Sequence, residues 1–132
     1  MAEEKQAKKI AVAIVTPEGK VFEGKVDYVS VPAKSGGLGV LPRHLPVIAQ
    51  LKVGIVKLID EGKPVYVGVC RGFFEFLNDK ANILTEHALL TTEENRQDTI
   101  EELKKKYDIT QEITEETRKV VQAIAGLKTL RQ

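Results

Sequence analysis

The sequence contains a single cysteine, Cys70, and no run of apolar residues long enough to span a bilayer. One cysteine excludes an intrachain disulfide framework and a cysteine-based metal site, so we interpret Cys70 as a small buried residue on a strand. A membrane helix needs about 20 consecutive apolar residues, and their absence leaves a peripheral role at most. Twenty basic and nineteen acidic residues leave a net charge of +1, which provides no general attraction to nucleic acid.

Motifs of hydrolases, metalloproteases and nucleotide-binding phosphate loops are also missing. The residues that remain as candidates for catalysis are His44, His87, Glu86 and Cys70. Glu86 and His87 are adjacent on a predicted strand, so their side chains point to opposite faces and make a poor acid–base pair. We therefore predict no catalytic residue, no metal site and no cofactor for this chain.

The N-terminal residues 2–9 are polar and charged, without the apolar centre of a secretory signal or the bias of a transit peptide. This predicts a cytoplasmic protein. At 132 residues, with 42% hydrophobic and 30% charged residues, the chain has the length and composition of one soluble domain with a small terminal element attached.

Short β-branched and apolar segments, separated by turn residues, fill the first two thirds of the chain. We predict strands over residues 10–16, 20–23, 26–31, 47–51, 54–60, 64–70, 73–77 and 82–90. Pro32 is expected to end the third of these strands. No segment of helical period lies between the strands, so the pattern indicates a sandwich or a barrel rather than an α/β sheet.

Residues 35–46 contain three glycines, two prolines and one of the two histidines. Glycine permits positive φ or close backbone approach, while proline fixes φ and removes a hydrogen-bond donor. We interpret the segment as one shaped loop between strands. The alternatives are a binding site and a plain β-corner whose glycines serve only the turn.

From Thr91 onward the sequence has no proline, one glycine and many Glu, Lys, Gln and Arg residues, which favour helix. Thr91 and Glu94 have the spacing of a capping box, and Ile100, Leu103 and Tyr107 form a thin apolar stripe. A second helix is predicted from Thr110 or Thr114, with Ile113, Val120, Val121, Ile124, Leu127 and Leu130 on one side. We therefore expect two domains, a β-domain over residues 1–90 and a helical hairpin over residues 91–132.

The order and spacing of several motifs closely resemble the epsilon subunit family of bacterial F-type ATP synthases. These motifs are Val-Thr-Pro-Glu-Gly at residues 15–19, Val-Ser-Val at 29–31, the glycine- and proline-rich residues 35–46, Gly-Phe-Phe-Glu at 72–75, and the terminal helical hairpin. The resemblance implies a mainly β plus α fold, a two-layer β-sandwich followed by an antiparallel two-helix hairpin. It also implies a non-catalytic rotor subunit of the central stalk, peripheral at the cytoplasmic face of the bacterial plasma membrane.

The resemblance implies specific partners and residues. The sandwich would bind the gamma subunit and sit on the polar loops of the c-ring, while the extended helices would meet the beta subunit, with the alpha subunit as a second candidate, and inhibit ATP hydrolysis. Contact with the membrane would run only through the complex. The implied c-ring interface comprises Ser35, Gly36, Gly37, Leu38, Gly39, Pro42, Arg43 and His44. The implied regulatory cations are Lys104, Lys105, Arg118, Lys119 and Lys128, for which a solvated face paired with nearby glutamates is the alternative.

Two departures from the family pattern shape these expectations. Gly37 stands where many relatives carry an acidic residue, so the c-ring contact is expected to depend on shape, backbone groups and His44 rather than on a carboxylate. Residues 92–98 read Thr-Glu-Glu-Asn-Arg-Gln-Asp, and only Arg96 matches the ATP-binding motif of some relatives, which predicts weak or no ATP binding. The alternative function is a free cytoplasmic ligand sensor with the helices as a lid.

Overall fold

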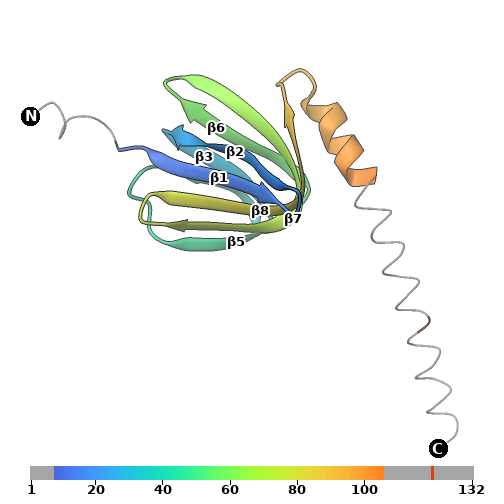
Figure 1. Cartoon of the computed structure of the whole chain (residues 1–132), viewed down its shortest axis with the longest axis horizontal. Coiled ribbons are helices and arrows are strands. Elements are labelled where there is room, and N and C mark those ends of the chain that lie inside the picture. Colours follow the sequence, from blue (N-terminus) through green and yellow to red (C-terminus); the bar gives the residue numbers. More distant parts are fainter. Residues whose placement is uncertain (1–7, 106–119, 121–132) are drawn as a thin grey trace, which may run out of the picture.

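The computed structural model describes residues 8–105 and Val120 of the 132-residue chain (Figure 1). Within this part, one eight-stranded sheet has the order β2-β1-β8-β7-β5-β3-β4, and β6 pairs with both β3 and β7. The strands are β1 (Ile10–Thr16), β2 (Gly19–Val26), β3 (Tyr28–Ala33), β4 (Gly36–Val40), β5 (Val47–Leu51), β6 (Gly54–Asp60), β7 (Lys63–Leu77) and β8 (Lys80–Thr91). Residues 96–105 form a helix that follows β8 after a short turn.

The sheet folds into two layers because its long strands bend at the same level. β5 and β6 pair with β7 in one common register, with Leu51 opposite Gly72 and Gly54 opposite Val69. β8 pairs with β7 on both sides of this bend. The first layer therefore holds β2, β1, β5 and the halves of β7 and β8 next to their connecting turn, and the second layer holds β3, β4, β6 and the other halves. The predicted sandwich is confirmed, although residues 64–70 and 73–77 belong to one bent strand.

The first layer is completed by a parallel pair. β1 runs antiparallel to β2 and parallel to β8, from Ala11 opposite Lys80 to Val15 opposite Leu84. Alternate residues of each strand point between the layers, where they form a single apolar core. Its fully buried large side chains include Ile10, Ile14, Leu51, Leu58, Phe74, Phe76 and Ile83. Cys70 is buried on β7, as predicted.

The bend in β7 depends on a glycine and a threonine hydroxyl. Gly72 has a φ of 147°, and a Cβ there would stand 1.9 Å from the carbonyl oxygen of Leu84, so only glycine fits. The buried hydroxyl of Thr85 accepts a hydrogen bond from the Cys70 N–H at 3.2 Å. It also lies 2.9 Å from the Cys70 carbonyl and 2.8 Å from that of Arg71, which are candidate acceptors for its own proton. Thr85 thus satisfies backbone groups at the bend.

An ionic cluster holds together the turns at the opposite end of the sandwich. Asp27, between β2 and β3, accepts a 2.7 Å hydrogen bond from the Glu61 N–H in the β6–β7 turn. The Lys9 ammonium lies 3.4 Å from Asp27 and also bonds Asp60. The Glu61 N–H, with Lys9 as a further cause, holds the pKa of Asp27 below its ordinary value, and Asp60 with Asp27 raises the pKa of Lys9.

The helix begins differently from the sequence prediction. Thr91 is the last residue of β8, and the Thr92 hydroxyl caps the turn by accepting a 3.2 Å hydrogen bond from the Asn95 N–H. The expected Thr91–Glu94 capping box is therefore wrong, because the Thr91 hydroxyl instead accepts a 2.7 Å hydrogen bond from Thr99. The predicted second helix and Tyr107 lie outside the described residues, except Val120, which is helical and exposed.

The helix packs on the second layer of the sandwich. Leu103 is completely buried and Thr99 nearly so, and both side chains lie directly over Gly68 of β7. Figure 1 shows this helix beside the end of the sandwich where β7 and β8 bend. No helix among residues 8–105 and Val120 has the length and apolar character required to cross a membrane.

Two further expectations are wrong. Residues 35–46 are not one loop, because residues 36–40 form β4, an edge strand paired with β3 along its whole length. Pro32 does not end its strand but lies inside β3. Its carbonyl accepts a hydrogen bond from the Lys52 N–H. The nitrogen of a strand residue faces the same side as its carbonyl, and on this side of β3 the pairing with β6 stops at Ser30. Proline is tolerated there because no ladder donor is needed.

Candidate functional site

The loop of residues 41–46, hereafter the end loop, connects β4 to β5 at one end of the sandwich. The His44 N–H donates to the Leu41 carbonyl at 3.1 Å, which closes a tight turn. The Arg43 N–H donates to the Asp79 carboxylate at 2.5 Å, and the His44 ring packs edge-on against Phe76 with ring centres 5.8 Å apart. The end loop is therefore fixed against the β7–β8 turn.

The predicted c-ring interface is divided between two places. Pro42, Arg43 and His44 lie in the end loop, with Arg43 and His44 exposed. Ser35 and Gly36 lie at the opposite end of β4, where the Lys34 N–H bonds the Gln50 carbonyl near the bend. Between Gly36 and the end loop lie the four strand residues 37–40, a span of about 13 Å at 3.3 Å per residue.

The residues between these two groups alternate across β4. Gly37 and Gly39 are exposed, and the Tyr28 side chain covers Gly39 so closely that a Cβ would stand 2.3 Å from its hydroxyl oxygen. Leu38 is half-buried and packs against the core. A partner that touches both ends of the predicted interface must therefore lie along the edge strand.

An apolar area lies on the outer face of the first layer, and the sequence analysis did not assign it. Ile48, Phe73 and Leu84 expose 72%, 54% and 54% of their surface. Phe73 stands directly opposite Leu84, and Phe73 and Leu84 line both a shallow hollow that reaches Pro17 and another that reaches Ile48. We call Ile48, Phe73 and Leu84 the apolar face. The unbroken apolar pair Phe73-Phe74 is a sequence signal for it, because neighbouring strand residues point to opposite faces.

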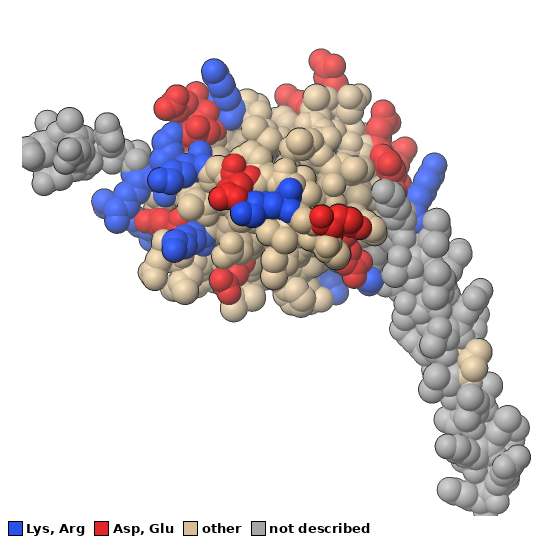
Figure 2. All heavy atoms as spheres, in the orientation of Figure 1, with Lys and Arg blue, Asp and Glu red and all other residues tan. Residues whose placement is uncertain are grey.

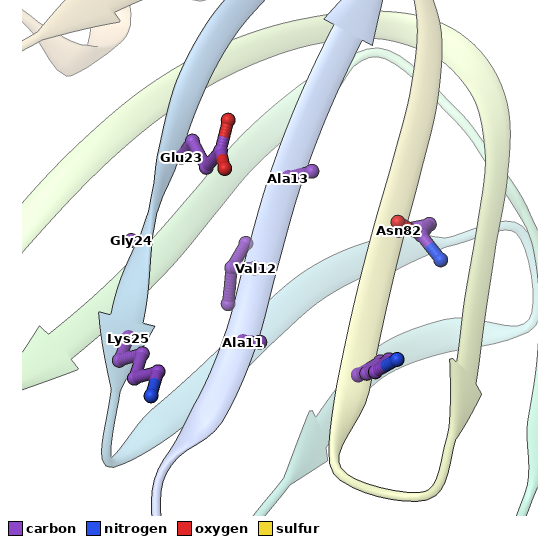
Figure 3. A pocket seen from close by; sticks show the side chains of 8 residues that line it. Ala11, Val12, Ala13, Glu23, Gly24, Lys25 and Asn82 are labelled. Carbon is purple, nitrogen blue, oxygen red and sulfur yellow. The ribbon is translucent and has the colours of Figure 1, made fainter.

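A third hollow, of about 500 Å³, continues this outer surface along β1. Figure 3 shows the short side chains of Ala11 and Ala13 on β1 between the longer ones of β2 and β8. Lys25 and Lys80 flank Ala11, and Glu23 and Asn82 flank Ala13. The hollow is thus lined by small side chains in the middle and by polar side chains at both sides.

The remaining candidate residues do not converge. Lys104 and Lys105 are exposed on the helix, whereas Arg118, Lys119 and Lys128 lie outside the described residues. On the face shown in Figure 2, basic and acidic groups are interspersed among uncharged areas.

The candidates for catalysis are also apart. Glu86 is exposed and bonds Arg71 at 2.8 Å, while the neighbouring residue His87 is half-buried. In residues 8–105 and Val120, no three His, Cys, Asp or Glu side chains are grouped so that they could hold a metal ion.

Comparison with known proteins gives consistent matches. Residues 9–91 match the family model described as "ATP synthase, Delta/Epsilon chain, beta-sandwich domain". The chain is 46% identical over 81 residues to the ATP synthase epsilon chains of Bacillus thuringiensis (strain Al Hakam) and Bacillus cereus (strain B4264). Each match covers 61% of this chain and 61% of the relative, so the chain spans about three fifths of the length of these curated relatives.

Two solved structures share the fold. One is the mitochondrial ATP synthase of Euglena gracilis, OSCP/F1/c-ring, with a TM-score of 0.59 and 22% identity over 62% of this chain and 53% of that chain. The other is the central stalk and c-ring of the mitochondrial ATP synthase of Tetrahymena thermophila, with a TM-score of 0.52 and 13% identity over 64% of this chain and 69% of that chain. These likenesses establish the sandwich architecture and nothing beyond it.

Proposed function

The chain belongs to the ATP synthase delta/epsilon chain family, characterised by its β-sandwich domain, and from this premise we propose that it is a non-catalytic rotor subunit of the central stalk. In this role it couples rotation of the ion-driven c-ring to ATP synthesis in the catalytic head. The subunit contributes contacts and geometry rather than reacting groups. It is peripheral, bound through the complex at the cytoplasmic face of the bacterial plasma membrane.

The observation that carries this proposal is the apolar face. Ile48, Phe73 and Leu84 remain exposed on the first layer, whereas Gly68 on the second layer is covered by Thr99 and Leu103 of the helix. Exposed apolar areas with polar surroundings are typical of protein interfaces. We assign the apolar face to the gamma subunit, because it stays exposed in the part of the chain that the structure describes, while the other layer is covered by the helix of residues 96–105.

The end loop is assigned to the polar loops of the c-ring. It lies at one end of the sandwich, is held rigidly by Asp79 and Phe76, and presents the exposed residues Arg43 and His44. A rigid loop suits a contact that must transmit torque, because little entropy is lost on binding and little motion is absorbed.

The helical part is assigned a regulatory role. Lys104 and Lys105 are exposed cations on a helix that contacts the sandwich through Thr99 and Leu103. A small contact of this kind is compatible with two packings that differ by a few kcal/mol. In the second packing the helices would extend to the beta subunit and oppose ATP hydrolysis. Removal of residues 91–132 should then raise hydrolysis by the assembled head without abolishing synthesis.

The proposal is tested by binding of the full chain to purified gamma subunit and to purified c-ring. Phe73→Asp should weaken gamma binding by about tenfold or more, because it places a charge in the apolar interface. Leu90→Asp, at another exposed leucine outside the apolar face, is the matched control and should leave gamma binding unchanged. Failure of the wild-type chain to bind either partner would overturn the rotor assignment. Equal loss in both variants would overturn the assignment of this face.

A further inference from the structure

Residues 41–44 form a β-turn with an unusual residue at its third position. The His44 N–H bonds the Leu41 carbonyl, Pro42 fixes φ near −65° at the second position, and Arg43 has a φ of 72°. These features define a type II turn, which requires positive φ at its third position and strongly favours glycine there. The chain therefore holds an arginine in a backbone conformation that disfavours it.

The Asp79 carboxylate lies where it compensates for this strain. In a type II turn the central peptide is reversed relative to type I, so the N–H of the third residue points away from the side it faces in type I. That N–H belongs to Arg43, and it donates to Asp79 Oδ1 at 2.5 Å. A type I turn would withdraw the donor from the carboxylate. A hydrogen bond to an ionised acceptor is among the stronger ones in proteins.

Asp79 is itself fixed by the sheet. Its carbonyl accepts a 2.9 Å hydrogen bond from the Ala11 N–H of β1, and it lies with Asn78 in the two-residue turn between β7 and β8, where both residues have positive φ. Phe76, on β7 and separated from this turn only by Leu77, packs against the His44 ring. The turn that carries the carboxylate is thus part of the rigid first layer.

We infer that Asp79 is a positioning residue of the end loop: its carboxylate selects the type II form of the 41–44 turn and so sets the direction in which the Arg43 side chain leaves the sandwich. The inference rests on the proposed function in that the end loop is taken to be the part that meets the c-ring. Leu41 and Leu45, two residues before and two residues after Arg43 in the sequence, are highly exposed, so the end loop presents one cation together with two apolar side chains. A change in turn type would flip the peptide between Pro42 and Arg43 and so redirect the Arg43 side chain relative to the two leucines.

The test compares the full-length wild-type chain with Asp79→Ala, Arg43→Gly, the double variant, and Glu93→Ala as a control for loss of an exposed carboxylate. Amide hydrogen exchange of Arg43 is followed by NMR on the free chain, and affinity is measured for purified c-ring. Asp79→Ala should speed exchange of the Arg43 amide and weaken ring binding, each by about tenfold. Glu93→Ala should change neither.

Arg43→Gly separates positioning from a general structural effect. Glycine adopts positive φ without help, so adding Asp79→Ala to Arg43→Gly should change ring affinity by less than about twofold. Unchanged Arg43 exchange in Asp79→Ala would overturn the inference. An equal loss of affinity from Asp79→Ala in both backgrounds would also overturn it, because a merely structural role does not depend on residue 43. If the wild-type chain fails to bind the ring, the proposed function fails, and the exchange measurement alone decides whether Asp79 sets the turn.

Discussion

Gly68 of β7 lies so close beneath Leu103 of the helix that a Cβ at position 68 would stand 2.8 Å from Leu103 Cδ1. The same Cβ would stand 2.5 Å from Thr99 Cγ2. The absence of a side chain at this single position therefore determines how closely the helix approaches the second layer. Leu103, which makes this close approach, is completely buried.

Gly68→Ala should weaken the contact between helix and sandwich by about 1–3 kcal/mol, because a methyl group there overpacks the interface. Amide exchange of residues 96–105 should rise more than exchange in the strands. Gly37→Ala is the control, since nothing lies within 4 Å of its Cβ position, and it should change stability by no more than about 0.5 kcal/mol. Equal exchange in the two variants would contradict this account of helix docking.

Gly72→Ala should be far more damaging, with a loss of more than about 3 kcal/mol in the free energy of unfolding or failure to fold. The Cβ would stand 1.9 Å from the backbone oxygen of Leu84, which no side-chain movement relieves. Gly62→Ala also replaces a glycine of positive φ, but in open space, and should cost about 1 kcal/mol. Denaturant unfolding of both variants separates the steric part of the cost from the conformational part, and similar losses would argue against the steric account.

Thr85→Val should destabilise the sandwich by about 1–3 kcal/mol. Valine has nearly the shape of threonine but leaves the Cys70 N–H without the hydroxyl oxygen that accepts its hydrogen bond. The loss should appear in the midpoint of chemical denaturation, and amide exchange at Cys70 should rise. A neutral result would mean that water or a shifted backbone replaces the hydroxyl at the bend.

The Lys9–Asp27 cluster should make stability depend on pH at both extremes. The pKa of Asp27 is lowered in the folded chain from its ordinary value of 3.8, so its contribution is present above pH 3.8 and is lost as the pH falls through the folded pKa. The pKa of Lys9 is raised from 10.5, so its contribution is present below pH 10.5 and is lost as the pH rises through the folded pKa.

Unfolding curves across pH test this cluster. Asp27→Asn should be less stable than wild type near pH 7, and the difference between the two should shrink in acid. Lys9→Met should also be less stable than wild type near pH 7, and the difference between these two should shrink in alkali. Parallel curves for wild type and Asp27→Asn from pH 2 to 7 would contradict a role for this carboxylate in acid sensitivity.

Most strands were predictable from the sequence because alternation and turn residues act locally. Pro17-Glu18-Gly19 and Glu61-Gly62 each separate two apolar runs, and both mark turns in the structure. β4 was missed because Gly37 and Gly39 occupy its outward positions. The inward residues Leu38 and Val40 therefore do not alternate with polar side chains, and the strand pattern is hard to recognise. Glycine has no side chain from which a face can be recognised, and the same residues are expected in a loop.

The contacts that organise the candidate site were not predictable, because they join residues distant in the chain. Arg43 meets Asp79, and Thr85 meets Cys70, only after the strands have paired. Neither pair has a spacing that local periodicity reveals. Resemblance to the family predicts a c-ring interface that includes Pro42, Arg43 and His44 of the end loop, but the turn conformation that presents Arg43 follows from an aspartate in another hairpin.

The parallel pairing of β1 with β8 has a consequence for synthesis of the protein. β1 leaves the ribosome before the other described strands, yet its partner on this side, from Lys80 to Leu84, belongs to β8, the last of these strands to emerge. Pairings between distant segments form slowly, since loop closure must precede them. Until β8 arrives, β1 has one unpaired edge, and an exposed edge of that kind invites pairing with other chains. Nascent chains halted before β8 should therefore be the species that chaperones must protect.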